Sequence, residues 1–347
     1  MATLTFAFLD AGQGDCTLIQ YPDNSLVMVD CGSIKNSSVV SGEVTTVLNR
    51  VLPAAGNKIS NLVLTHADQD HYNMLKDVII TPGVTVDQVY YGCDINLYKN
   101  QNESNATYDW LSAHSNASAP PNTFGGAKVN AALSRAGVTC YVLAANASGS
   151  PKAKDSHNRN TNSVVLLFIY NDNKVFMMGD ASEETEDFII TSCKTNKISS
   201  RLTNANLTVL KMGHHGSQTS SSEAWIKALT PDYVVVSSDT RQFGSNGKGM
   251  PTRSLLDNVL TWSSISDLPK DFCHPYVLYE DDSSSSNYRK FLAVGPSRQA
   301  ICTTLYEIQY DHTGVNFEAT GGSWYYYLNS SGNPSVTVGW TGPKTTC

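Results

Sequence analysis

Hydrophobic and polar positions follow two kinds of pattern along the chain. Residues 3–9 alternate, with Leu4, Phe6 and Phe8 on one side, which predicts a half-buried strand. The same alternation, or a short apolar run between turn residues, predicts further strands at 16–21, 25–30, 60–65, 86–92, 138–144, 163–170, 174–180, 207–212, 232–238, 274–279 and 301–310. Amphipathic stretches predict helices at 42–52, 71–80, 126–136, after Ser182 and at 221–229.

The order of these segments is strands first, then strand–helix alternation, and then the same sequence of patterns again. Two similar halves packed as helix, sheet, sheet and helix account for this order, so the expected fold is an α/β (α+β) αββα four-layer sandwich. We expect residues 1–265 to form this domain, with 93–125 as a polar insertion or loop. Residues 266–347 are expected to form a β-rich C-terminal extension packed on it.

Charge and hydropathy exclude some classes of protein. The net charge is −7, so the basic surface typical of nucleic-acid-binding proteins is absent, although bound cations can supply local positive charge. The chain has no run of eighteen apolar residues, so no transmembrane segment is expected. Its start reads as a strand rather than a signal peptide. The compartment stays open between cytoplasm and export without a classical signal peptide, and the oligomeric state is unknown.

The densest chemical signal follows the apolar strand at 60–65. His66, Asp68, Asp70 and His71 lie within six residues of one another, directly after that strand. A loop at a strand end can direct several side chains to one point, and imidazole with carboxylate suits zinc, manganese or iron. The sequence therefore predicts a metal site here.

Two later strands end in residues of the same kinds. Asp180 follows the apolar run KVFMM, and His214 follows LTVLK. Either one alone is weak, because a Gly-Asp pair is usually a turn and a His pair is often exposed. Their common position after a buried strand favours one shared site.

Taken together, these motifs resemble the metallo-β-lactamase superfamily, and most closely its ComEC-like branch. The motifs that carry the resemblance are Asp10-Ala11-Gly12-Gln13-Gly14-Asp15, Val29-Asp30-Cys31-Gly32, the cluster at 66–71, Asn160-Thr161-Asn162-Ser163 and His214-His215-Gly216-Ser217. They cover roughly residues 3–240.

The resemblance implies two adjacent metal sites bridged by Asp180. One site would use Asp70, His71, Asp180 and His214, with His214 preferred over His215. The other would use His66, Asp68 and Asp180, but Asp68 replaces a histidine, and Arg159 stands where a further histidine would align. His157 is a candidate substitute. Replacing an imidazole with a carboxylate weakens the preference of a site for zinc. One or two divalent ions are therefore expected, with zinc as the first choice and manganese or magnesium as alternatives.

The implied activity is hydrolysis by a metal-activated water, with a phosphodiester of a nucleic acid or small molecule as substrate. Asp70 would orient the water, while His215 and Ser217 would contact substrate or support the ligands. Asp15 and Asp30 are expected to be structural or to support the ligands.

Two alternatives stay open. Residues 322–340 resemble a single choline-binding repeat, which would favour a phosphorylcholine esterase or another ester, lactone or amide hydrolase. An ordinary Gly- and Tyr-rich hairpin packed on the domain explains the same residues. The third possibility is a non-catalytic metal-binding scaffold.

Overall fold

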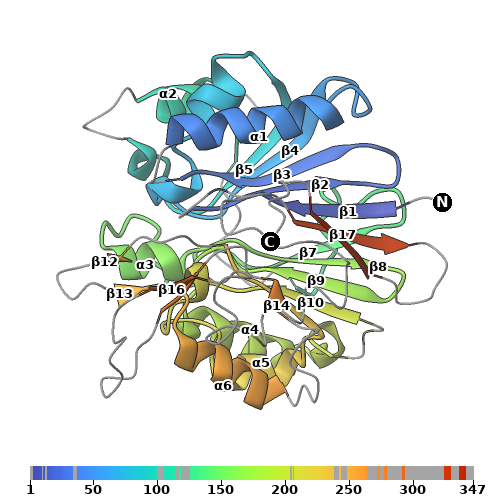
Figure 1. Cartoon of the computed structure of the whole chain (residues 1–347), viewed down its shortest axis with the longest axis vertical. Helices are drawn as coiled ribbons and strands as arrows, with labels where there is room; N and C mark the ends of the chain where they lie inside the picture. Colours follow the sequence, from blue (N-terminus) through green and yellow to red (C-terminus); the bar gives the residue numbers. More distant parts are fainter. Residues whose placement is uncertain are drawn as a thin grey trace.

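The computed structural model describes residues 3–9, 11, 14–33, 37–99, 105–114, 117–118, 126–203, 205, 207–237, 242–243 and 248–263, and five strands between 272 and 340. These residues form two sheets packed face to face, with helices on both outer surfaces (Figure 1). The predicted αββα four-layer sandwich is confirmed.

The first sheet has eight strands and the second has six. The first runs in the order β18 (Val336–Trp340), β17 (Trp324–Asn329), β1 (Thr3–Phe8), β2 (Cys16–Gln20), β3 (Leu26–Cys31), β4 (Lys58–Leu64), β5 (Thr85–Tyr91) and β6 (Ala117–Ser118). The second runs in the order β14 (Phe272–Cys273), β11 (Tyr233–Val235), β10 (Leu207–Lys211), β9 (Asn173–Met177), β8 (Val165–Tyr170) and β7 (Thr139–Ala144). Two small hairpins pair β12 (Gln242–Phe243) with β13 (Lys248–Gly249), and β15 (Val277–Tyr279) with β16 (Phe291–Ala293).

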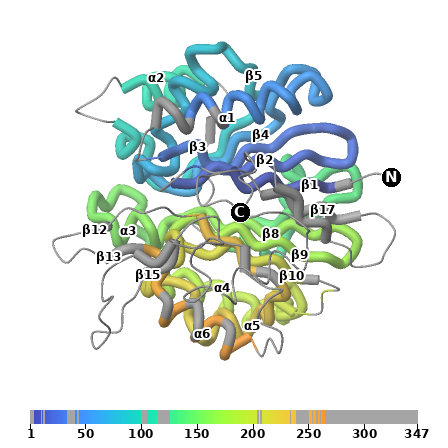
Figure 2. The backbone as a smooth tube through the Cα atoms, in the orientation of Figure 1, coloured from blue at the N-terminus to red at the C-terminus, as the bar shows by residue number. Residues whose placement is uncertain are grey.

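Helices cover the outer face of each sheet. The first sheet carries α1 (Ser37–Val51) and α2 (Ala106–Ala113), and the second carries α4 (Glu183–Thr195), α5 (Glu223–Leu229) and α6 (Arg253–Ser263). The short α3 (Ser156–Thr161) lies between these layers, close to the facing edges of the sheets (Figure 1). The tube view shows the two halves of the chain as successive blocks of colour (Figure 2).

Alternation along β1 divides its side chains between two cores. Leu4, Phe6 and Phe8 are at most 3% exposed and belong to the core between the sheets, where Phe6 meets Phe168 edge-on. Ala7 faces the second core, beneath α1. The predicted face of this strand is confirmed, and period-two alternation explains how one strand serves both layers.

The parallel strands fix where the polar loops lie. β3, β4 and β5 pair in parallel, and so do β9, β10 and β11. Their carboxyl ends therefore meet at one edge of the sandwich, where the loops after β3, β4, β9 and β10 face one another.

Three helix predictions need correction. The helix predicted at 42–52 extends back to Ser37. The helix predicted at 71–80 is shortened to the π-helix η2 (Lys76–Ile80), preceded by the 3₁₀ turn η1 (Gln69–His71), because the Met74 N–H donates to the Cys31 carbonyl at 3.1 Å. Residues 126–136 form turns, since the Asn130 side chain accepts the N–H groups of Ala132 and Leu133.

The predicted insertion at 93–125 and the predicted extension beyond residue 265 also contain helices and strands. Within 93–125 the described part contains η3 (Ile95–Tyr98), α2 and β6. β17 pairs antiparallel with β1 and β18, and β14 pairs in parallel with β11, so the first sheet receives two strands from beyond residue 265 and the second receives one. The strand predicted at 301–310 lies outside the described residues. In the described part of the chain, no helix combines the length and apolar character needed to span a bilayer.

Gly32, just after β3, supports the loop that follows β4. A Cβ atom there would lie 2.3 Å from the Asp70 carbonyl carbon and 2.4 Å from the His71 nitrogen. Gly32→Ala should therefore lower the free energy of unfolding by about 1–3 kcal/mol, the usual cost of overpacking. Gly42→Ala in α1 is the matched control, because a Cβ there meets no atom within 4 Å. Urea unfolding of both variants checks the difference, and equal stabilities would contradict it.

Candidate metal centre

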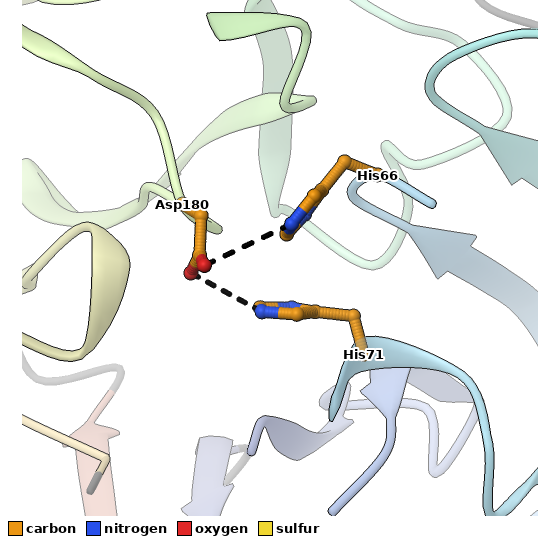
Figure 3. Close-up of side chains that lie close together, drawn as sticks. All are labelled: His66, His71 and Asp180. Carbon is orange, nitrogen blue, oxygen red and sulfur yellow. Dashed lines mark ion pairs between the residues drawn. The ribbon is translucent and has the colours of Figure 1, made fainter. Parts of the chain in front are cut away.

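Three chain segments converge at the shared edge of the sheets. The loop after β4 brings His66, Asp68, Asp70 and His71, the turn after β9 brings Asp180, and the 3₁₀ turn η5 (His214–Gly216) after β10 brings two histidines. His66 and His71 point from one sheet toward Asp180 on the other (Figure 3). The expected convergence of these distant residues is present in the geometry.

Asp180 lies at the centre of the cluster and is only 3% exposed. Its Oδ1 lies 3.2 Å from His71 Nε2 and 3.5 Å from His215 Nε2. Its Oδ2 lies 3.7 Å from His66 Nε2 and 3.9 Å from His214 Nε2. The carboxylate therefore has a histidine pair on each side, as a bridging ligand would.

Asp30 orients the His71 ring from behind. Its Oδ2 lies 2.9 Å from His71 Nδ1, and its two oxygens accept from the N–H and the hydroxyl of Thr65 at 2.7 and 2.8 Å. If Nδ1–H donates to this carboxylate, the His71 Nε2 lone pair is directed into the cluster. The expected supporting role of Asp30 fits this contact.

The two neighbouring histidines of η5 have different environments. His215 is 1% exposed, its Nδ1 lies 2.9 Å from the Ser237 carbonyl oxygen, and its Nε2 lies 3.3 Å from Asp70 Oδ2. His214 is 24% exposed, with Nδ1 at 2.8 Å from Thr219 Oγ1 and Nε2 at 3.3 Å from Asn160 Nδ2. From the sequence, His214 was preferred as the ligand beside Asp70 and His71. In the structure His215 lies in that place, so the geometry favours His215.

Two other predicted residues lie outside the cluster. Ser217 Oγ contacts Thr219 Oγ1 at 3.1 Å, so it supports the residue that holds His214. His157 is exposed on α3, and its Nε2 pairs with Glu184 Oε1 at 3.3 Å. These contacts engage both side chains away from Asp180, so the geometry does not favour either one as a ligand.

Asp68 is held by an arginine. Arg159 Nε donates to Asp68 Oδ1, and Arg159 Nη1 donates to the Lys154 carbonyl oxygen. The other oxygen, Asp68 Oδ2, accepts from Ser156 Oγ at 3.3 Å and lies 3.7 Å from His66 Nε2. The predicted ligand Asp68 is therefore already neutralised by a cation of the protein.

Sequence reasoning missed one buried cation beside the cluster. Lys211, the last residue of β10, is 1% exposed, and its Nζ lies 2.9 and 3.0 Å from the two oxygens of Asp15. Asp15 Oδ2 in turn lies 3.9 Å from His71 Nδ1. A lysine in the apolar run LTVLK was the available signal, because a buried lysine needs a charged partner.

Burial and opposite charge act against each other on the pKa values of this cluster. Burial alone would raise the pKa of the Asp180 carboxyl, but the charges of His215, His71 and His214 hold it well below its ordinary value. Burial would lower the pKa of His215, yet Asp180 and Asp70 raise it to about 9. Asp180 and Asp30 likewise outweigh burial and raise the pKa of His71 well above 6.5. Without metal, the two histidines thus carry the protons that offset the carboxylates.

The donor set fits a divalent cation. The side-chain atoms His66 Nε2, His71 Nε2, His215 Nε2 and Asp180 Oδ1 are buried without a hydrogen-bond partner. Ligand atoms of Asp70, His71 and His215 lie within 4.8 Å of one another, as do those of His66, His71 and Asp180. Buried polar atoms are almost always hydrogen-bonded. Several buried polar atoms without partners that point to one place therefore indicate a site for a bound cation.

The raised histidine pKa values predict how the metal-free protein responds to pH. A pKa raised on folding contributes stability that is complete below the unfolded value, about 6.5, and is lost as pH rises through the folded value. Because the folded pKa of His215 is about 9, the melting temperature of chelator-treated protein should fall between pH 6.5 and 9. His215→Gln should flatten this slope, and a wild-type melting temperature that stays constant over the window would contradict the assignment.

Two curated bacterial proteins are similar to this chain, and no family model matches it. Recombination protein 2 of Haemophilus influenzae is 26% identical over 234 residues, covering 66% of this chain and 24% of that protein. ComE operon protein 3 of Bacillus subtilis is 25% identical over 250 residues, covering 66% of this chain and 27% of that protein. The chain thus spans about a quarter of the length of these relatives.

Solved structures with a similar arrangement are more distant. A protein of Parabacteroides distasonis that is described as a metal-dependent hydrolase has a TM-score of 0.39 and 14% identity, covering 78% of this chain and 92% of that one. The short form of human tRNase Z has a TM-score of 0.39 and 9% identity, covering 68% and 93%. A diphosphatase of the PhnP family has a TM-score of 0.35 and 10% identity, covering 68% and 87%.

Proposed function

We propose that the chain is a metal-dependent hydrolase that cleaves phosphodiesters with a metal-activated water. The observation that carries this proposal is the convergence of His66, His71 and His215 Nε2 atoms, all buried without hydrogen-bond partners, on the carboxylate of Asp180. When bound in such a site, a divalent cation lowers the pKa of water and polarises a phosphoryl oxygen.

Asp70, His71, Asp180 and His215 would hold this ion. Each has a second contact that fixes its position or charge: Asp30 for His71, the Ser237 carbonyl for His215, and the histidine charges for both carboxylates. Zinc suits two imidazoles with two carboxylates, and manganese or magnesium would suit the carboxylates.

Asp70 has a second task in this proposal. Its side chain is 14% exposed, whereas those of His71, Asp180 and His215 are at most 4% exposed. It is therefore the residue of the four that best reaches solvent, and we assign it the orientation of the attacking water. Partly exposed His214 and Arg159, at 24% and 23%, lie at the edge where a substrate would approach.

The choice of a phosphodiester rests on two supports. The motifs resemble the ComEC-like branch, and a similar protein carries the name recombination protein, which favours a nucleic acid over a lactone or amide. The acidic net charge of −7 favours short substrates over long duplexes.

The alternative phosphorylcholine esterase rests on residues 322–340. β17 and β18 from this region pair with each other, and β17 pairs with β1. That arrangement gives the hairpin a place in the first sheet, which accounts for it without a choline ligand. The alternative therefore serves as a comparison arm of the test.

A substrate panel separates these functions. The full chain, loaded in turn with Zn²⁺, Mn²⁺ or Mg²⁺, would be assayed on bis-p-nitrophenyl phosphate, a short single-stranded oligonucleotide, p-nitrophenyl phosphorylcholine and a lactone. We expect turnover of the first two. Turnover confined to phosphorylcholine or lactone would reject the phosphodiesterase, and less than one equivalent of bound metal would favour the non-catalytic scaffold.

A further inference from the structure

If the proposed metal-dependent function is correct, the Oδ1 side of Asp180 offers more ligands for a cation than the Oδ2 side. On the Oδ1 side, Asp70, His71 and His215 gather their ligand atoms within 4.8 Å of one another. On the Oδ2 side, His66 joins such a group only together with His71 and Asp180, the same residues that serve the first side. Among the described residues, no such group includes Asp68 or His214.

Asp68, one of two carboxylates whose oxygens lie 3.7 Å from His66 Nε2, already has a permanent counterion. Arg159 Nε donates to Asp68 Oδ1, and the side chains are 23% and 17% exposed, so water screens the pair only in part. A guanidinium cannot lose its proton in a protein, so this positive charge persists at any working pH. A divalent ion bound to Asp68 would therefore be repelled by the positive charge of the adjacent Arg159 guanidinium.

The local fold holds Arg159 in this position. α3 begins after Asp155, whose carboxylate accepts the Asn158 N–H at 2.9 Å. Arg159 Nη1 donates to the Lys154 carbonyl oxygen in the same turn. Ser156 Oγ adds a 3.3 Å contact to Asp68 Oδ2. Two guanidinium nitrogens of the arginine, Nε and Nη1, thus donate hydrogen bonds, and both bonds would break if the side chain moved aside.

We propose that Arg159 takes the electrostatic place of a second metal ion, so that the chain binds one divalent cation, at Asp70, His71, Asp180 and His215. The guanidinium neutralises Asp68 beside His66 and keeps another cation from that side. This inference rests on the proposed function, because it presupposes that the first cation binds.

Counting bound Mn²⁺ tests the inference without reference to activity. Chelator-stripped full chain would be titrated with Mn²⁺, and free Mn²⁺ measured by electron paramagnetic resonance. Wild type should bind one equivalent. Arg159→Gln should bind a second, with an affinity at least about tenfold higher than any second binding to wild type, the scale of effects from residues that contact metal ligands.

Matched variants separate the ion pair from general charge. Lys154→Gln removes the same charge from an exposed side chain five residues earlier and should leave the count at one. Arg159→Lys keeps a cation and should also bind one. Arg159→His, which offers an imidazole beside Asp68 and His66, should bind two and provides a second test if Arg159→Gln folds poorly, as judged by circular dichroism.

The outcomes distinguish this inference from the function beneath it. Two equivalents of similar affinity in wild type would overturn the role of Arg159 and leave the metal-dependent function standing. One equivalent in both Arg159→Gln and Arg159→His, with both variants folded, would overturn it equally. No binding at all to wild type would overturn the proposed function and this inference together.

Discussion

Asp180→Ala should lower the proposed phosphodiesterase activity by about three orders of magnitude or more, since it removes a charge at the reacting centre that the surrounding fold holds in place. Asp180 is the residue that faces both histidine pairs, with oxygens 3.2–3.9 Å from four imidazole nitrogens. The variant should also lose its tightly bound metal. Steady-state kinetics with Zn²⁺ and Mn²⁺, and the metal content after dialysis, measure both effects.

The control for this variant is Asp187→Ala. Asp187 is an exposed aspartate on α4, seven residues later, and no contact joins it to the cluster. It should keep wild-type activity and metal. Retention of activity by Asp180→Ala, or an equal loss in both variants, would contradict the assignment of Asp180 as the central ligand.

His215→Gln should be far more harmful than His214→Gln, although the two residues are adjacent. We expect at least about a hundredfold loss of metal affinity for His215→Gln, because a buried ligand with a fixed ring orientation disappears. His214→Gln should lose less than about tenfold, since its ring is partly exposed and held by Thr219 and Asn160. Competition with a metal-binding dye gives both affinities. The reverse ranking would restore the sequence-based preference for His214.

The place of most of the proposed ligands could be predicted from sequence, for a simple reason. The proposed ligands Asp70 and His71, Asp180, and His215 lie in three segments that each follow an apolar run, and parallel strands bring their carboxyl ends to one edge. The buried strands themselves were visible because apolar runs and alternation depend on local spacing alone. The layer order followed from the order of strands and helices.

The choice between His214 and His215 could not be predicted in this way. Both residues have left-handed backbone angles, with φ of 47° and 52°. Such angles are uncommon for residues with a Cβ, and they redirect the side chains in a manner that regular spacing does not reveal. The turn therefore places the second histidine, rather than the first, against Asp70.

Long-range polar contacts were equally hidden. Arg159 and Asp68 are 91 residues apart, and Lys211 and Asp15 are 196 apart. Neither pair has a periodic signal, because an ion pair depends on how the loops pack rather than on local pattern. The helix predicted at 126–136 does not form, and the reason is local. The Asn130 side chain accepts hydrogen bonds from backbone N–H groups that a helix would use.

The X-ray absorption spectrum of the zinc-loaded full chain would show directly whether these side chains bind the ion. We expect a shell of nitrogen and oxygen ligands at about 2.0–2.1 Å, with the outer scattering of two imidazole rings, from His71 and His215. Loss of one imidazole in His215→Gln should follow. A zinc spectrum with sulfur ligands, or with water oxygens and no imidazole scattering, would contradict the claim that these buried side chains form a metal centre.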